Sequence, residues 1–253
     1  MTPWAISGIA FVCVFGGALL GMYCRTRLRQ HHLSPESKDL VRLGVGLIAT
    51  MAALVLGLLI ASAKGAYDTQ RSELIQMSSK IVILDRVLAH YGPQAKEARD
   101  YLRLTVVGML DQFWPEGGPR RAEKEPAGAG GVVEAFYDKV QALAPQNDPQ
   151  RSLQAQALGI TMDIGQTRWL MFQQRDSSIS VPLLAVVVFW LTIIFMSFGL
   201  FAQPDALTIG VLFVSAISVS AAIFLILELD QPFGGLIQIS SAPLRNALAL
   251  LGR

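Results

Sequence analysis

The side chains of this chain that could do chemistry are carboxylates placed at or beyond the ends of long apolar stretches. They are Asp68, Glu73, Asp85, Glu228 and Asp230. Carboxylates that a fold brings together can bind a cation or transfer protons. Basic residues are interleaved with them, namely Lys64, Arg71 and Arg86. Ion pairs between neighbouring helices are therefore the simpler interpretation, and a cation or catalytic site is the alternative.

Recognisable motifs for catalysis and for metal binding are absent from the sequence. It contains no Gly-x-Ser-x-Gly elbow, no P-loop and no Gly-x-Gly-x-x-Gly fingerprint. His31 and His32 are adjacent and His90 is far away, while Cys13 lies inside the first apolar stretch and Cys24 at its end. Neither set has the spacing of a metal site or of a disulfide framework. We expect no enzyme, no cofactor and no metal.

The composition is that of a membrane protein. Hydrophobic residues make up 52% of the 253 residues and charged residues only 16%, against roughly 25% charged in a soluble domain. Apolar runs of about 20 residues, enough to cross a bilayer as a helix, occupy residues 4–23, 41–63, 181–202 and 208–227. The net charge of +2 offers no basic face for nucleic acid. We expect an all-α protein with four transmembrane helices in the inner membrane.

These spans divide the chain into four parts. They are a first hairpin (1–63), an extramembrane region (64–180), a second hairpin (181–229) and a C-terminal interfacial segment (230–253). Apolar residues recur at steps of three and four at Leu74, Met77, Ile81, Leu84, Leu88 and Tyr91, and again at Leu153, Ala157, Ile160, Ile164, Thr167 and Met171. Both seams predict helices continuous with a span, which together would form a stalk. The Pro- and Gly-rich residues 114–131 predict a flexible linker, and a short helix should follow at 132–143.

Ionisable side chains are nearly absent from the interior of the spans. Arg42 lies at the start of span two, Lys64 lies at its end and Glu228 lies in the last turn of span four, all within reach of an interface. Ionisable groups deep in a bilayer are costly and usually functional. Their absence argues against a proton-coupled transporter.

Small residues recur at four-residue spacing in two of the spans. They are Gly17 and Gly21 in span one, and Ala49, Ala53, Gly57 and Ala61 in span two. Such spacing lets helices approach closely in lipid. The stripes could pack the four spans of one subunit, or span two could pack against copies of itself around an axis. In the second case the pore-lining candidates are Ala49, Ala53, Leu56, Gly57, Ile60 and Ala61. Four helices enclose no wide path, so a conducting form would be a homo-oligomer.

Span four ends in a turn. Glu228 and Asp230 mark the interface, and Pro232 stops the helix because it lacks a backbone donor. Gly234 and the glycine after it allow the chain to fold back, either along the membrane surface or against the stalk. Glu228 could pair there with Lys64 or Arg71, which would brace span four against the stalk.

Three stretches carry a family resemblance. They are "ALVLGLLIASAKGAYDTQRSEL" (53–74), "LDRVLAHYGPQAKEAR" (84–99) and "AAIFLILELDQPFGGLIQISSAPLRNAL" (221–248). Together with the order of spans, they resemble the bestrophin-like family of bacterial membrane proteins. That family is remotely similar to the bestrophins, which are pentameric anion channels. The resemblance therefore implies an anion-conducting oligomer.

The resemblance also has departures. In bestrophins a Pro-Phe-Gly after the last membrane helix opens an acidic calcium clasp, and Pro232, Phe233 and Gly234 match it. The next residues are Gly-Leu-Ile-Gln, so the acids of the clasp are missing, and one Glu and one Asp cannot supply the six or more oxygens that calcium needs. Bestrophin pores are lined by aromatic residues on the second helix, whereas 41–63 contains none. A pore here would have an aliphatic constriction, which can gate by dewetting.

Two arguments conflict over the side of the membrane. Arg25, Arg27 and Arg29 follow span one, and the positive-inside rule then places the stalk and both termini outside the cytoplasm. The bestrophin resemblance implies a cytoplasmic stalk. Basic residues also flank the spans on the stalk side, among them Lys64 and Arg175. The charge count slightly favours the first arrangement.

The leading hypothesis for function is an oligomeric ion channel, anion-conducting, with span two nearest the axis. The alternative is a non-conducting membrane scaffold or sensor whose stalk binds a protein partner. An enzyme acting on lipid at the interface is a remote third. In every version the partners are membrane lipid and other copies of the chain.

Overall fold

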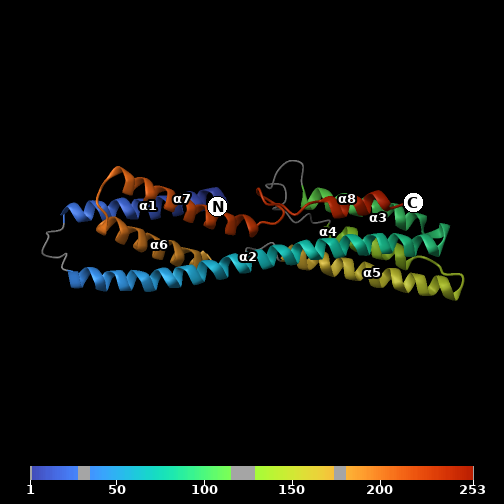
Figure 1. Cartoon of the computed structure of the whole chain (residues 1–253). Helices are drawn as coiled ribbons and strands as arrows, with labels where there is room; N and C mark the ends of the chain where they lie inside the picture. The colour runs from blue at the N-terminus through green and yellow to red at the C-terminus, as the bar shows by residue number, and fades with distance from the viewer. Residues whose placement is uncertain (1, 28–34, 115–128, 174–180, 253) are drawn as a thin grey trace. The chain divides into compact units, whose positions relative to one another are not determined.

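The computed structural model describes residues 2–27, 35–114, 129–173 and 181–252. Its helices are α1 (Pro3–Arg27), α2 (Pro35–Tyr91), the 3-10 turn η2 (Pro93–Ala95), α3 (Lys96–Phe113), α4 (Ala129–Gln141), α5 (Asp148–Gln173), α6 (Val181–Phe201), α7 (Ala206–Leu229) and α8 (Ala242–Leu250). The described part of the chain contains no strand, so the expected all-α class is confirmed. Figure 1 shows these helices along the chain.

The chain forms two compact units. The membrane unit comprises Met1–Tyr67 and Ser177–Gln231, and the extramembrane unit comprises Asp68–Asp176 and Pro232–Arg253. Within the described residues, four helices are long and apolar enough to span a membrane, namely α1, α2 from Asp39 onward, α6 and α7. The four predicted spans are thus confirmed. Helix α2 runs unbroken for 57 residues, so span two and the first stalk helix are one helix.

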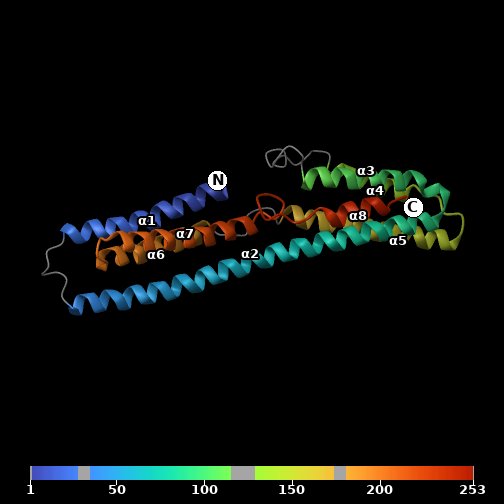
Figure 2. The ribbon, with the colours of Figure 1, turned by 45° about the horizontal axis from the view of Figure 1, so that its top comes forward.

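Helices α1 and α6 pack closely in the membrane unit, and Figure 2 shows α7 beside them. A Cβ placed on Gly17 would lie 2.8 Å from Cγ2 of Thr192. One placed on Gly21 would overlap the backbone of Met196, and one on Gly199 would overlap the backbone of Ala18. The glycine pair of span one therefore serves the close approach of two helices of the same subunit, which only a missing side chain permits.

Apolar contacts complete the core of the membrane unit. Phe213 of α7 lies edge-on to Phe11 and Phe15 of α1, with ring centroids 5.6 and 5.4 Å apart. Arg25 at the end of α1 donates to the carbonyl of Ala202, just beyond α6. A cation there complements the negative end of the α6 dipole. The C-terminal ends of α1 and α6 are therefore joined.

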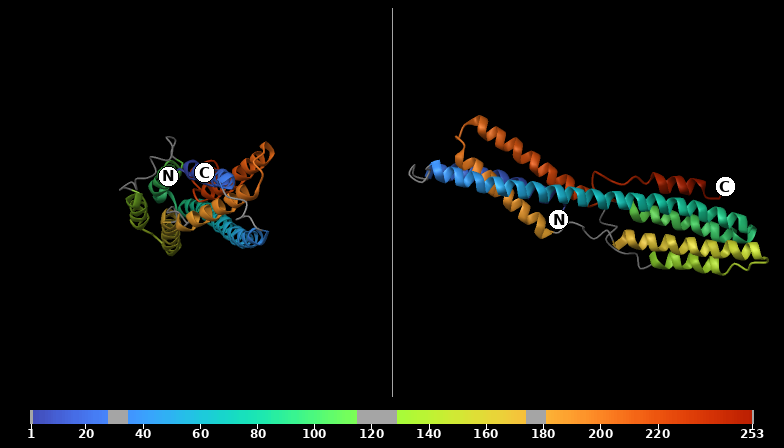
Figure 3. Two further views of the ribbon diagram at one scale, coloured as in Figure 1. Left: turned by 90° about the vertical axis from the view of Figure 1, so that its left-hand side faces the viewer. Right: turned by 60° about the horizontal axis from the view of Figure 1, so that its bottom comes forward.

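The extramembrane unit is a helical bundle built on the second part of α2 with α3, α4, α5 and α8 (Figure 3). The seam read from the sequence is its core: Leu74, Met77, Ile81, Leu84 and Leu88 are fully buried. On α5 the corresponding residues Ala157, Ile164 and Met171 are buried as well. The helix expected at 132–143 begins earlier, at Ala129, and ends at Gln141. Most of the expected linker 114–131 lies outside the described residues, but Trp114 is described and packed.

The C-terminal segment packs within the extramembrane unit. The Phe233 ring lies 5.0 Å from the Phe113 ring and 5.5 Å from the Trp114 ring, between centroids. The indole Nε1 of Trp114 donates to the carbonyl of Ile239 at 2.9 Å. The preceding turn uses Gly235 at a φ of 75°, a left-handed conformation that favours glycine. Of the two places considered for this segment, α8 occupies the one against the helical bundle, where it contacts α3.

Candidate functional site: the exposed side of helix α2

One side of α2 is left uncovered by the membrane unit. Helix α2 contributes Ala52, Leu59 and Ala63 to the core shared with α1, α6 and α7. Only 11% of the most apolar stretch of α2 is buried, against 28 to 39% of the corresponding stretches of the other three spans. Span two is therefore the least enclosed of the four.

The predicted pore-lining residues divide into two groups. Ala53, Gly57, Ile60 and Ala61 are exposed, and a Cβ added to Gly57 would meet nothing within 4 Å. Ala49 and Leu56 are instead partly buried against the core of the same subunit. The stripe on α2 thus differs from the one on α1, whose glycines are covered by α6.

The exposed side of α2 is chemically uniform. Between Arg42 and Lys64 it has no charged residue, and its hydroxyls are those of Thr50 and Ser62. The Thr50 hydroxyl donates to the carbonyl of Gly46 at 2.9 Å, within the helix. This surface offers small and aliphatic side chains with a basic residue near each end. It can hold helices close together or line a dry constriction.

The acidic residues of the predicted interface turn are placed in different surroundings. Glu228, in the last turn of α7, is only 1% exposed, and Asp230 is half-buried. Lys64 is exposed, with its ammonium 5.2 Å from the ring centroid of Tyr67, and Arg71 is exposed on α2. The pairing of Glu228 with Lys64 or Arg71 stays a prediction. A carboxylate as buried as Glu228 is costly unless it is paired or protonated.

Asp85 has a partner that sequence reasoning missed. Its buried carboxylate accepts two hydrogen bonds from Arg99 of α3, at 2.8 and 2.9 Å. The backbone N–H of Gly252 approaches the same carboxylate at 3.3 Å. The hydrogen bond from Arg99 raises the pKa of that guanidinium above its ordinary value. The signal for this pair in the sequence is that a basic residue, Arg99, follows Asp85 by 14 positions, beyond the Gly-Pro break.

The comparisons with known proteins bear on this arrangement. A family model described as the bestrophin-like domain matches residues 12–244. The chain belongs to the bestrophin-like family. The structure is similar to those of single-residue variants of a bacterial bestrophin homolog from Klebsiella pneumoniae. One has a TM-score of 0.69 at 14% identity and covers 97% of this chain and 98% of that one. Another has 0.67 at 15% identity, with 98% and 99% covered.

At such identities the likeness to solved structures shows the fold. No curated protein matches the chain. Within this bestrophin-like chain the matched Pro-Phe-Gly has a packing role, since Pro232 is buried and Phe233 contacts Phe113 and Trp114. Among the described residues no group of three His, Cys, Asp or Glu side chains is placed to hold a metal ion.

Proposed function

We propose that this bestrophin-like protein is a homo-oligomeric ion channel of the inner membrane, conducting anions, with α2 nearest the axis. The observation that carries the proposal is the uncovered, uncharged side of α2, with Ala53, Gly57 and Ala61 exposed along the span. Small residues at this spacing allow copies of the helix to approach closely in lipid.

The residues on this side of α2 support a particular kind of pore. Side chains such as Ile60, 44% exposed, would form an aliphatic constriction that opens by wetting. No carboxylate lies between Arg42 and Lys64 to repel an anion, and these two residues place positive charge near the ends of the span. The resemblance of the family to bestrophin channels also supports the proposed anion selectivity.

The experiment is conductance of purified protein in planar bilayers, with paired glycine variants. Gly57→Leu places a large side chain at the proposed axis. Gly210→Leu places the same side chain at an equally open position on α7, where an added Cβ also meets nothing within 4 Å. We expect anion currents in the wild type and in Gly210→Leu, and a large loss in Gly57→Leu. Silent bilayers containing intact oligomers at high protein load would contradict the proposal.

A second candidate is a non-conducting scaffold or sensor whose extramembrane unit binds a protein partner. It is favoured by the near absence of charged residues from the interior of the four spans, which leaves no polar path within one subunit. An oligomer whose axis stays sealed by aliphatic side chains in every state would support it.

A further inference from the structure

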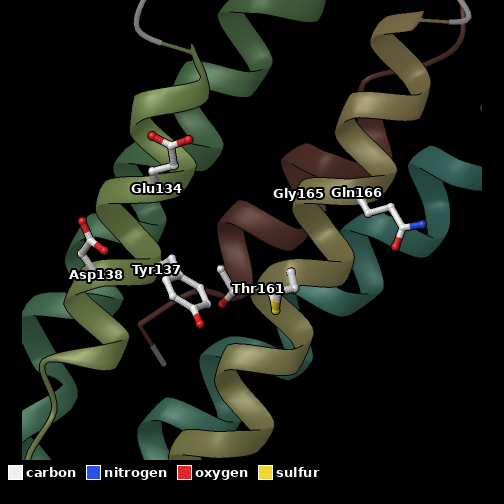
Figure 4. A pocket seen from close by; sticks show the side chains of 7 residues that line it. Glu134, Tyr137, Asp138, Thr161, Gly165 and Gln166 are labelled. Atoms are coloured by element: carbon white, nitrogen blue, oxygen red, sulfur yellow. The ribbon is translucent and has the colours of Figure 1, made fainter.

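A groove lies between α4 and α5, two helices of the extramembrane unit. Its volume is about 420 Å³, within the range of roughly 300–1,000 Å³ that is usual for small-molecule sites. It is lined by Glu134, Tyr137 and Asp138 of α4 and by four residues of α5 between 161 and 166, Thr161 and Met162 among them. In Figure 4 the Tyr137 ring points from α4 toward Thr161 on α5. The groove is therefore large enough for a small ligand that contacts both helices.

The side chains that such a ligand would meet first are an aromatic ring and a thioether. Tyr137 is half-buried, and Met162 is 63% exposed, so its sulfur is open to solvent. Thr161 is buried, and its hydroxyl already donates to the carbonyl of Ala157 at 2.8 Å. Aromatic rings and methionine sulfur both make favourable contacts with apolar groups of irregular shape. The body of the ligand should therefore be apolar.

The α4 side of the groove carries uncompensated negative charge. Glu134 and Asp138 are exposed and lie one helical turn apart, and neither forms an ion pair with any residue that the structure describes. No lysine or arginine belongs to the lining. The nearest basic residue along α4, Lys139, is already paired with Glu97 of α3. The ligand should therefore carry positive charge.

The chemistry of the lining favours an organic cation over a metal ion. A tyrosine ring attracts an ammonium group that lies within about 6 Å of its centroid. A hard cation such as Ca²⁺ needs six or more oxygen ligands. In the described ranges no group of three His, Cys, Asp or Glu side chains is placed to hold a metal. An ammonium group can instead use the Tyr137 ring and the charge of the two acids together.

The length of the groove favours a small molecule over a partner helix. Its lining on α4 runs over residues 134–138, which is about 6 Å along a helix, and its lining on α5 runs over residues 161–166, which is about 8 Å. A helix that docks in a groove uses anchors from i to i+7, which are about 10 Å apart. The groove is shorter than such a helix needs.

We propose that the α4/α5 groove binds a small organic cation, an ammonium group attached to an aromatic or alkyl body. The cation lies over the Tyr137 ring, where Glu134 and Asp138 supply the opposite charge, and the apolar body contacts Met162. This inference goes beyond the proposed channel. The site belongs to the extramembrane unit alone, and its occupancy is measured without any current.

Equilibrium dialysis of the full chain in a nonionic detergent tests the proposal, with labelled benzyltrimethylammonium as the probe. Two matched probes are N-benzylacetamide, which has as many non-hydrogen atoms and no charge, and phenylacetate, which is an anion. We expect saturable binding of the cation. Binding of the other two should be about tenfold weaker, which is the size of one cation–π contact.

Variants of the lining separate the ring from the charge. Tyr137→Leu keeps apolar surface but removes the ring, so it should weaken binding of the cation about tenfold, whereas Tyr137→Phe should bind it nearly as the wild type does. Glu134→Gln combined with Asp138→Asn should weaken binding several-fold, and more at low salt than at high salt. The matched control is Asp100→Asn with Asp111→Asn, two exposed acids of α3, which should leave the affinity unchanged.

Oxidation of Met162 locates the bound cation. Dilute hydrogen peroxide converts an exposed methionine to its sulfoxide, and mass spectrometry follows the rate at each methionine. Saturating benzyltrimethylammonium should slow the oxidation of Met162 several-fold in the wild type and should have no effect in Tyr137→Leu. Met51, 44% exposed on α2, is the reference and should react at an unchanged rate.

Several results would overturn the inference. They are the lack of saturable binding, equal binding of the cation and N-benzylacetamide, and unchanged affinity in Tyr137→Leu. Displacement of the probe by an equal concentration of Ca²⁺ or Mg²⁺ would show that the acids hold a metal ion instead. Saturable binding that leaves the oxidation of Met162 unchanged would place the cation outside the groove.

Discussion

The carboxylate of Asp85 and the guanidinium of Arg99 form a two-pronged ion pair between α2 and α3, with both hydrogen bonds shorter than 3.0 Å. The Asp85 side chain is 2% exposed and that of Arg99 is 22% exposed. Planar, paired hydrogen bonds of this kind are among the strongest polar contacts in proteins. They fix α3 on α2 just after the chain reverses at Gly92, whose φ is 121°.

Removal of Arg99 should destabilise the extramembrane unit strongly. Arg99→Met leaves the buried Asp85 charge without its partner, and breaking a buried pair in this way costs about 3–5 kcal/mol. The matched control is Lys80→Met, because the Lys80–Asp163 pair at 3.0 Å is largely exposed and such pairs contribute about 1 kcal/mol or less. Thermal unfolding in detergent measures both. Equal small losses would show that the Asp85 pair is no stronger than a surface pair.

The contact between α3 and α4 should weaken in acid. The Lys139 ammonium hydrogen-bonds to Glu97 and attracts its charge, which lowers the pKa of Glu97 below its ordinary value of 4.5. Because the folded pKa is the lower one, the stabilising effect is present above about pH 4.5. It is lost as the pH falls through the folded pKa. Amide hydrogen exchange of α4 should therefore rise on acidification in the wild type, and a Glu97→Gln variant should show less of this rise.

Enlarging Gly21 should disrupt the membrane unit. A methyl group there meets the backbone of Met196, which cannot move aside without separating α1 from α6. We expect Gly21→Ala to lower stability by about 1–3 kcal/mol, as overpacking does. Gly16→Ala, five residues earlier and open to its surroundings, should be neutral or slightly stabilising, since alanine favours a helix. Melting of the two purified variants side by side decides the point, and equal melting temperatures would contradict it.

Neutralising Glu228 should weaken assembly. The side chain is 1% exposed at the end of α7, where a carboxylate needs a partner. Glu228→Gln keeps the shape and removes the charge, so it breaks the predicted pair with Lys64 or Arg71, and the fraction of full-size oligomer should fall. Asp230→Asn, at a half-buried position two residues later, should have the smaller effect. An unchanged oligomer in Glu228→Gln would reduce the acid to a marker of the membrane boundary.

The side of the membrane on which the extramembrane unit lies can be read with one cysteine. Arg25, one of the basic residues that follow span one, donates a hydrogen bond to the carbonyl of Ala202 just beyond α6. The family resemblance implies a cytoplasmic extramembrane unit, the reverse of the arrangement that the charge count slightly favours. In a background with both native cysteines replaced by alanine, Gln156→Cys, exposed on α5, should then resist an impermeant thiol reagent in intact cells. It should react after the cells are opened, and labelling of intact cells would support the charge rule instead.

The sequence by itself determined the four spans and the apolar seams of the extramembrane unit. Span length and hydrophobic period are local properties, and burial of Leu74, Met77 and Ile81 follows from their spacing alone. It also identified α2 as the helix with a stripe of small residues, and four of its six candidate residues are exposed. The remaining two, Ala49 and Leu56, sit on the edge of that stripe and are partly covered by their own subunit.

Only the tertiary structure decided which partners these residues meet. Gly17 and Gly57 have the same kind of spacing to their neighbours in the sequence, yet α6 covers the first and nothing in the subunit approaches the second. Asp85 likewise had several basic residues nearby in the sequence, and the reversal at Gly92 selected Arg99. The reason is that a repeat or a charge specifies what kind of surface a helix presents. Which helix faces that surface depends on contacts between residues far apart in the chain.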